Sequence, residues 1–247
     1  MEAGMSRITK LIMAVINITM VIYMFQMMQS VLGQVSETIG GGDGGGAPPP
    51  EEGYLLYDDF NDNSIDSSKW DGVTKTGDYT ADSGVYEQNQ QLEVKSGMSG
   101  TTQTRVWIAS QDRFSFASGK LQIEVDLTVP SSDDQGSCVL LSNTGQNSFD
   151  DSIYIYIRNG SSSPLTQISK KVGGSQQNLY EQSAFHGNGT YKIVIDSTNI
   201  SLYYEGTLIN TVAHGLSWTD GYLYLMATGK DTSTLTHVFD NLRVKKV

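Results

Sequence analysis

Hydrophobic residues follow two different patterns along this chain. Residues 11–35, LIMAVINITMVIYMFQMMQSVLGQV, form an apolar stretch without a formal charge. At about 1.5 Å per residue, a helix of this length can cross a hydrocarbon core of about 30 Å. After residue 54 no segment keeps a helical period, and apolar residues alternate with polar ones instead. The pattern therefore predicts one N-terminal transmembrane-type α-helix followed by a mainly β region.

The alternating segments are short, and turn-forming pairs separate them. The clearest alternation falls in residues 121–129, 152–157, 191–195 and 222–227. Pairs such as Asn159-Gly160 and Asp220-Gly221 lie beside such segments and favour tight turns. Many short strands with regular turns are typical of an antiparallel two-sheet sandwich. We expect one such domain over residues 54–247, which we call the head.

Composition divides the rest of the chain into an anchor and a spacer. Residues 1–39 contain the predicted helix, which we expect to anchor or assemble the protein. Residues 40–53 begin with GGGDGGGAPPP, a composition that predicts a linker. Arg7 and Lys10 precede the apolar stretch, which places the N-terminus in the cytoplasm and the head outside. No A-x-A-like cleavage motif follows, so we expect the anchor to be uncleaved.

Polar and small residues recur along one side of the predicted helix. They are Thr19, Tyr23, Gln26, Ser30 and Gly33. Two interpretations fit their spacing: the polar groups lie in the headgroup zone, or they contact copies of the same helix. Buried Gln is costly in lipid, and small residues permit close helix approach. The second interpretation predicts a homo-oligomer joined through residues 10–36.

Charge and cysteine content exclude several classes of function. The chain has a net charge of -11 and no basic stripe, so nucleic acid is not an expected partner. Its one cysteine, Cys138, rules out an intramolecular disulfide and a cysteine-based zinc site. Cys138 lies in the apolar run SCVLL, which predicts a buried, inert thiol.

Five segments of the head resemble a known family in both content and order. They are residues 57–70, 84–97, 114–127, 191–211 and 238–246. Together they are similar to concanavalin A-like (LamG-like) lectin/glucanase domains. The resemblance implies an antiparallel jelly-roll β-sandwich. It leaves function open, because lectins, glycosidases and structural modules share this scaffold.

The glucanase branch of this family implies carboxylates at alternate positions of one strand, where they share a face. Glu124 and Asp126 have this spacing, but the third position is Thr128, or Val129 in the bulged form of the motif. The resemblance also aligns this strand with the one before the catalytic strand. We interpret the two carboxylates as a solvated strand face and expect no catalytic residues and no enzymatic activity.

Other residue patterns give weaker indications of catalysis or metal binding. His186, His214 and His237 have no ligand spacing, and no nucleophile elbow occurs. The resemblance implies a structural calcium ion where the first and last strands meet, with Asp59 and Asp240 at the matching positions. The alternative is that Asp59 shapes a loop and Asp240 pairs with Arg243 or a backbone donor.

For a glycan ligand we expect aromatic side chains on the concave face to stack on sugar rings. The candidates are Tyr154, Tyr156, Trp107, Trp218, Tyr222 and Tyr224. The alternative is that these rings only cover the sheet. Asn159, Asn188 and Asn199 begin N-x-S/T sequons, which would permit glycosylation of an external head.

These expectations together predict a non-enzymatic structural or adhesive protein with a lectin-like head displayed on a cell, filament or virion surface. A hydrophobic helix carrying a β-sandwich resembles archaeal pilin-like proteins, although Thr9 replaces the Glu of a pilin-style processing site at Gly4-Met5. A virion surface protein is the rival plan. In either plan the N-terminus is cytoplasmic or buried in the assembly. The alternative function is a membrane-tethered glycoside hydrolase of the glucanase type.

Overall fold

The computed structural model describes residues 53–247. The predicted helix of residues 1–39 and the predicted linker, up to residue 52, lie outside the described residues, as does the line of polar residues on that helix. Within residues 53–247 there is no helix long and apolar enough to span a membrane.

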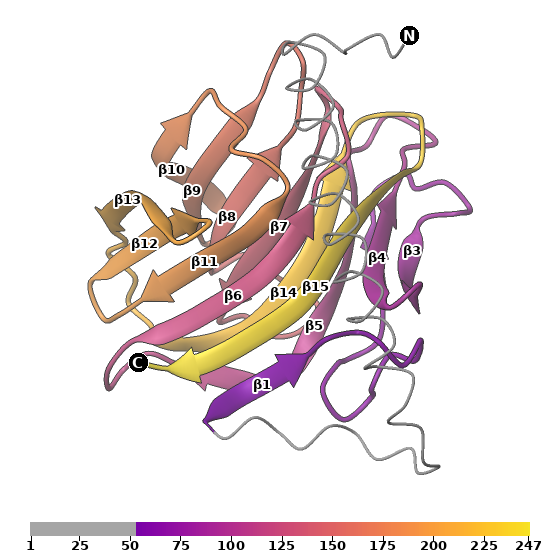
Figure 1. The fold of residues 1–247 in the computed structure, drawn as a ribbon. Helices are drawn as coiled ribbons and strands as arrows, with labels where there is room; N and C mark the ends of the chain where they lie inside the picture. Colours follow the sequence, from indigo (N-terminus) through magenta and orange to yellow (C-terminus); the bar gives the residue numbers. More distant parts are fainter. Residues whose placement is uncertain (1–52) are drawn as a thin grey trace, which may run out of the picture. The chain divides into compact units, whose positions relative to one another are not determined.

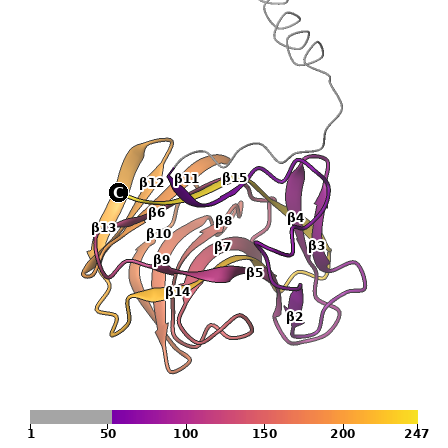
Figure 2. The same cartoon turned by 90° about the horizontal axis from the view of Figure 1, so that it is seen from below.

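The described residues form two antiparallel sheets that pack face to face. The first sheet contains, in spatial order, β13 (Thr207–Ala213), β12 (Asn199–Tyr204), β11 (Gly189–Ile195), β6 (Leu121–Thr128), β15 (Leu235–Lys246), β4 (Gln91–Ser96) and β3 (Gly84–Gln88), with β1 (Tyr54–Asp58) paired to β15. The second sheet contains β10 (Ser175–Gln182), β9 (Leu165–Val172), β8 (Ser152–Arg158), β7 (Gln135–Ser142), β14 (Asp220–Gly229), β5 (Thr104–Ser115) and β2 (Thr74–Thr76). β1 lies beside β15 in Figure 1, and Figure 2 shows β15 and β6 in one layer with β14 and β5 in the other. The predicted mainly β sandwich is confirmed.

The core between the sheets follows from alternation within each strand. Along β6, Leu121, Ile123, Val125 and Leu127 are buried, whereas the residues between them are partly exposed. These four side chains belong to one apolar cluster with residues from both sheets. The alternation in residues 121–129 therefore marks a strand with one face in the core.

The side chains of β8 form two rows, one of isoleucines and one of tyrosines, and the isoleucines face the core. Ile153, Ile155 and Ile157 are buried in the core, and Tyr154 and Tyr156 lie on the opposite side of the strand. Aliphatic β-branched side chains fill the space between two sheets, while tyrosine keeps its hydroxyl on the outer side.

The outer face of the second sheet carries a separate apolar cluster. It contains Trp107, Ala109, Cys138, Leu140, Tyr224 and Met226. For this reason every residue of β7 is buried, although only alternate ones face the core. The strand is covered on both sides, which explains its unbroken apolar run from Cys138 to Leu141.

A loop between β7 and β8 covers part of this outer face. The indole Nε1 of Trp107 donates a hydrogen bond to the carbonyl of Gln146 at 3.2 Å, and the hydroxyl of Tyr224 donates to the carbonyl of Ser148 at 2.8 Å. The ring of Phe149 packs edge-on against Trp107, with ring centroids 5.5 Å apart. The loop thus covers the part of the outer apolar cluster that contains Trp107 and Tyr224.

Candidate functional site

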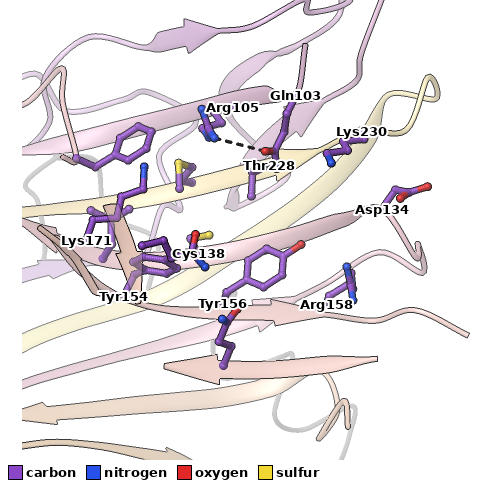
Figure 3. Close-up of a pocket in the computed structure, with 15 residues that line it drawn as sticks. Gln103, Arg105, Asp134, Cys138, Tyr154, Tyr156, Arg158, Lys171, Thr228 and Lys230 are labelled. Carbon is purple, nitrogen blue, oxygen red and sulfur yellow. Dashed lines mark hydrogen bonds between the residues drawn. The ribbon is translucent and has the colours of Figure 1, made fainter. Parts of the chain in front are cut away.

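A pocket lies on the outer face of the second sheet, beside the β7–β8 loop (Figure 3). We call it the outer-face pocket; its volume is about 290 Å³. Side chains from β5, β7, β8, β9 and β14 line it, including Arg105, Cys138, Tyr156, Lys171 and Thr228. A single sheet face therefore presents the pocket.

Strand pairing explains how residues far apart in the sequence reach this pocket. Met226 pairs with both Trp107 and Cys138, Cys138 pairs with Tyr156, and Tyr156 pairs with Gln167. Directly paired residues point to the same side of a sheet, so these five side chains form one row across the outer face. Trp107 lies at the end that the loop covers, and the rest of the row belongs to the pocket lining.

A glycine gives Tyr156 its place in the pocket. Gly136 lies on β7, and a Cβ atom added there would lie 2.5 Å from Cε2 of the Tyr156 ring. Any side chain at this position would push the ring away from β7. The absence of a side chain at Gly136 therefore allows Tyr156 to lie close over the strand.

The floor of the pocket is neutral. Burial raises the pKa of the Cys138 thiol to about 12. Burial also raises the pKa of Tyr154 to about 12, and it raises the pKa of Tyr156 further above its ordinary value. The raised pKa values favour the protonated forms near neutral pH, in which the phenols can donate hydrogen bonds. The thiol of Cys138 is buried, as the sequence predicts.

Charged groups lie around this neutral floor. Arg105, Arg158, Lys171 and Lys230 line the pocket, and Asp134 is its one carboxylate. Figure 3 shows them around the two tyrosines, with Asp134 and Lys230 just beyond the ends of strands. Arginine and lysine can hold an anion, and the tyrosine rings offer flat apolar faces to a ligand.

The structure brings together two of the six aromatic residues predicted to bind sugar. Tyr154 and Tyr156 line the pocket. Trp107 and Tyr224 are buried under the β7–β8 loop. Tyr222 packs on the same outer cluster, with the guanidinium of Arg113 5.0 Å from its ring centroid.

Trp218 lies elsewhere. Its ring packs against Phe116, a residue of the core between the sheets, with centroids 5.8 Å apart. Its place near a strand end is not the outer face of the second sheet, so the structure separates Trp218 from the pocket.

The charged residues of the pocket were not among the residues predicted from the sequence. Arg158 continues the alternation of Tyr154 and Tyr156 along β8, and that spacing was a signal for it. Arg105 and Lys171 carry no comparable signal, because they lie on β5 and β9, with β14, β7 and β8 between them in the sheet.

The carboxylates at alternate positions of β6 lie on the other sheet. Glu124 forms an ion pair with Arg243 at 3.3 Å, and Asp126 accepts a hydrogen bond from Nδ2 of Asn241 at 2.9 Å. Both side chains lie on the outer side of the first sheet, away from the pocket. They lie on a solvated strand face, as the alternation predicts, and each contacts a polar side chain of β15.

The next strand, β7, also lacks the carboxylates that the glucanase resemblance implies for the catalytic strand. Its side chains on the pocket face are Gly136, Cys138 and Leu140. None of them can act as an acid, a base or a carboxylate nucleophile in glycoside cleavage.

The two aspartates expected to hold calcium lie near each other. Burial raises the pKa of Asp240, and the charges of Asp126 and Asp59 raise it further. Asp240 accepts a hydrogen bond from the backbone N–H of Asn241 at 2.8 Å, and Asp59 accepts one from Asn61 at 2.7 Å. In residues 53–247 no group of three or more His, Cys, Asp or Glu side chains is placed to hold a metal ion. Calcium binding stays a prediction.

The three histidines lie in three separate environments. His237 is buried beside the Ser137 hydroxyl, 2.9 Å away, and burial lowers the pKa of His237 to about 3. The Nε2 of His214 lies 2.8 Å from the carbonyl of Asp196. His186 lies, partly buried, on the segment after β10, so the structure does not bring the three together.

The sequons lie on turns and a strand start of the head. The Asn159 amide donates to the carbonyl of Val129 at 3.2 Å, and the Asn188 side chain accepts from the N–H of Val129 at 3.0 Å. Asn199 begins β12, with its amide 2.8 Å from the Thr198 hydroxyl. Glycosylation at these positions stays a prediction.

Comparison with known proteins identifies the fold. No family model and no curated protein matches the chain. A β-1,3-1,4-glucanase (lichenase) from a mouse hindgut metagenome matches with a TM-score of 0.57 and 11% identity over 78% of this chain and 99% of that one. A family 16 endo-glucanase from Bacteroides ovatus matches with a TM-score of 0.57 and 15% identity, over 77% and 99%. The Bacillus licheniformis β-glucanase matches with a TM-score of 0.53 and 13% identity, over 80% and 100%.

These similarities confirm the concanavalin A-like jelly-roll fold of the head. They contradict the expectation of a non-enzymatic adhesive protein, because these three matching structures are glucanases. Carboxylates missing from one strand do not exclude activity, because the two groups that cleave a glycosidic bond need only flank it and can come from different strands. At this level of identity the likeness itself defines a fold.

Proposed function

We propose that the head is a carbohydrate-active domain that binds a glycan chain in the outer-face pocket. The observation that carries this proposal is the pocket itself, in which Tyr154 and Tyr156 offer ring faces between polar side chains. Its volume of about 290 Å³ is close to the lower end of known ligand pockets, about 300 Å³. Aromatic faces and hydrogen-bonding side chains are the two features that a sugar ring requires.

Polar groups beside the tyrosines suit the hydroxyls of a sugar. Gln103, the residue before β5, and Gln167 of β9 line the pocket. An amide can both donate and accept hydrogen bonds, as a sugar hydroxyl does. Gln167 is buried, so a ligand that reached it would bond in a site with little competing water.

Glycan binding is testable with the full chain on an array of neutral and charged glycans. We expect binding to a subset of glycans, and replacing Tyr154 and Tyr156 together with Ala should lower the affinity at least about tenfold, because both ring faces are lost. Tyr86→Ala is the matched control, since Tyr86 is an exposed tyrosine of β3 in the other sheet. Absence of binding to every glycan, or equal loss in the control, would overturn the proposal.

Glycoside hydrolysis is the second candidate function, and the glucanase neighbours favour it. Hydrolysis of this kind uses two carboxyl groups, one on each side of the scissile bond. Asp134 is the one carboxyl that lines the pocket, and it is exposed at the pocket edge. The proposal therefore assigns one of the two roles, acid or base, to Asp134, and the pocket lining supplies no carboxyl group for the other role.

Release of reducing ends from β-glucans and laminarin tests this candidate. We expect release by the full chain, strong reduction by Asp134→Asn, and no change in Glu124→Gln, whose carboxylate lies on the other sheet. Cleavage that survives Asp134→Asn would remove the assigned role. Bound glycan that is never cleaved would remove the hydrolytic function and leave the binding site.

The location of the head is a separate part of the proposal. We propose that residues 10–36 anchor the chain in a membrane and join copies of it, with the head outside. Sedimentation of the full chain in mild detergent should give an oligomer that Gln26→Leu with Ser30→Leu reduces toward the monomer, because the polar contacts between helices are lost. A strictly monomeric chain contradicts helix-driven assembly.

A further inference from the structure

The outer-face pocket is a cationic region in an acidic domain. Residues 53–247 contain 14 Lys and Arg against 22 Asp and Glu. The pocket reverses this balance. Its lining contains four positively charged residues, Arg105, Arg158, Lys171 and Lys230, and one negatively charged residue, Asp134. Grouped cations at a hollow in an acidic protein concentrate the positive potential at one place.

These four cations take no part in the ion pairs of the described part of the chain. Those ion pairs use Lys69, Lys95, Arg113 and Arg243. In the pocket, Arg158 Nε donates to the carbonyl of Ser163 at 2.7 Å. Arg105 donates to the neutral amide oxygen of Gln103 at 3.4 Å, the contact drawn in Figure 3. Neutral acceptors leave the positive charges uncompensated.

Two of the cations lie against the same aromatic ring. The guanidinium carbon of Arg105 is 5.4 Å, and the Nζ of Lys171 4.5 Å, from the ring centroid of Phe149. They come from β5 and β9, with three strands between them, so the sheet curves and its outer face is concave here. The ring holds two like charges near each other, which costs electrostatic free energy that an anion would remove.

The surroundings of Lys171 agree with this geometry. Burial lowers the pKa of Lys171, and the charge of Arg105 lowers it further, while Asp150 acts in the opposite direction. Asp150 forms no ion pair with Lys171 among the described residues. The ammonium group therefore remains short of negative partners.

We propose that the outer-face pocket selects an acidic glycan, and that the anionic group of one sugar, a carboxylate or a sulfate ester, binds between Arg105 and Lys171. This inference rests on the proposed function and names its substrate class. The planar guanidinium of Arg105 matches two oxygens of such a group, and the ammonium of Lys171 adds a point charge. A neutral glycan would leave both cations without a partner, so the preference is for the charged chain.

Pairs of ligands that share one sugar backbone and differ in charge separate the effect of charge on affinity from the effect of the sugar. The full chain is titrated with oligogalacturonate and with its carboxyl-reduced neutral form, and with a sulfated galactan oligosaccharide and its desulfated form. We expect each acidic ligand to bind at least about tenfold more tightly than its neutral counterpart, because an anion gains charge-assisted hydrogen bonds. The carboxylate and sulfate pairs show which anionic group the site prefers. Raised salt should weaken the binding of the acidic ligands only.

Three variants test the assigned residues. Arg105→Gln and Lys171→Gln should each lower the ratio of the affinity for the acidic ligand to that for the neutral one about tenfold. Arg105→Lys, which keeps the charge and loses the planar fork, should restore part of the affinity. Lys192→Gln is the matched control. Lys192 lies 4.3 Å from the ring centroid of Tyr203 on the first sheet, the same type of contact away from the pocket.

The outcomes distinguish this inference from the proposed function. Equal affinity for acidic and neutral ligands, or an equal loss in the Lys192 control, overturns acidic selection and leaves glycan binding in place. No binding of any glycan overturns the proposed function and this inference with it. The salt dependence of the unaltered protein gives a result even where a variant fails to fold, and unchanged affinity across salt concentrations also counts against the inference.

Discussion

The two sheets alternate inward and outward side chains in the same way, yet their outer faces differ. On the first sheet, Glu124 pairs with Arg243 at 3.3 Å, and Glu93 pairs with Lys95 at 3.1 Å. On the second sheet, Arg113 pairs with Asp220 at 2.7 Å, but the part of the outer face that holds the pocket has an apolar floor, a covering loop and four cations without ion-pair partners in the described residues. Side chains of opposite charge compensate each other within the protein, whereas cations of like charge beside an apolar floor can be compensated by an anionic ligand. This difference is the reason for proposing the ligand site on the second sheet.

Replacing Trp107 with a small residue should destabilise the packing on the outer face of the second sheet. Its ring is 1% exposed and packs against Phe149 and Tyr224. We expect Trp107→Ala to lower the free energy of unfolding by about 3–5 kcal/mol, because a large cavity opens and the hydrogen bond to the loop is lost. Urea unfolding followed by circular dichroism measures this. Tyr203→Ala, on the outer face of the first sheet, should cost about 1 kcal/mol or less; similar losses at both positions would contradict the comparison.

A pH effect should come from the first sheet. Burial, with hydrogen bonding to Asp62, raises the pKa of Glu87 on β3 to about 7. A carboxyl whose pKa is raised on folding stabilises the protein fully below its unfolded pKa, near 4.5, and loses that contribution as the pH rises through about 7. At 1.36 kcal/mol per pKa unit the change is about 1–3 kcal/mol.

Denaturant midpoints of the unaltered protein and of Glu87→Gln between pH 4.5 and 8 test this. The difference in stability between the two should change over this interval, with the unaltered protein losing more as the pH rises. Parallel pH curves for the two proteins would show that Glu87 does not titrate in this range. Glu181→Gln, an exposed glutamate of β10 in the second sheet, provides the control.

Phe149 links the loop to both cations of the pocket. The side chain is partly buried, so Phe149→Ala should cost about 1–2 kcal/mol of stability, less than a core phenylalanine. Glycan affinity should fall as well, since the ring supports Arg105 and Lys171. Thermal unfolding and glycan titration of the same variant measure both effects. A stability loss with unchanged affinity would limit Phe149 to covering the sheet.

The ion pair between Glu124 and Arg243 should give the smallest effect. Both side chains are partly exposed, and exposed pairs contribute about 1 kcal/mol or less. Glu124→Gln should therefore shift the urea midpoint only slightly and leave glycan affinity unchanged. A loss of glycan binding in this variant would place function on the first sheet and reverse the comparison between the two faces.

Much of the fold was determined by the sequence itself. Alternation along residues 121–129 and 152–157 predicts strands with one face in a core, and the structure has β6 and β8 there. The same alternation puts Tyr154 and Tyr156 on one side of β8. These features are local, because side chains of a strand alternate whatever the strand packs against.

The site was decided by the tertiary structure. Alternation cannot tell which side of β8 faces the core; packing of the isoleucines between the sheets turned the tyrosines outward. Trp107 became a covered residue and not a ligand contact because a loop closes over it. Arg105, Phe149 and Lys171 meet only because β5 and β9 belong to one curved sheet and the β7–β8 loop reaches between them. The order of strands in a sheet depends on pairing between distant segments, which no local spacing of residues specifies.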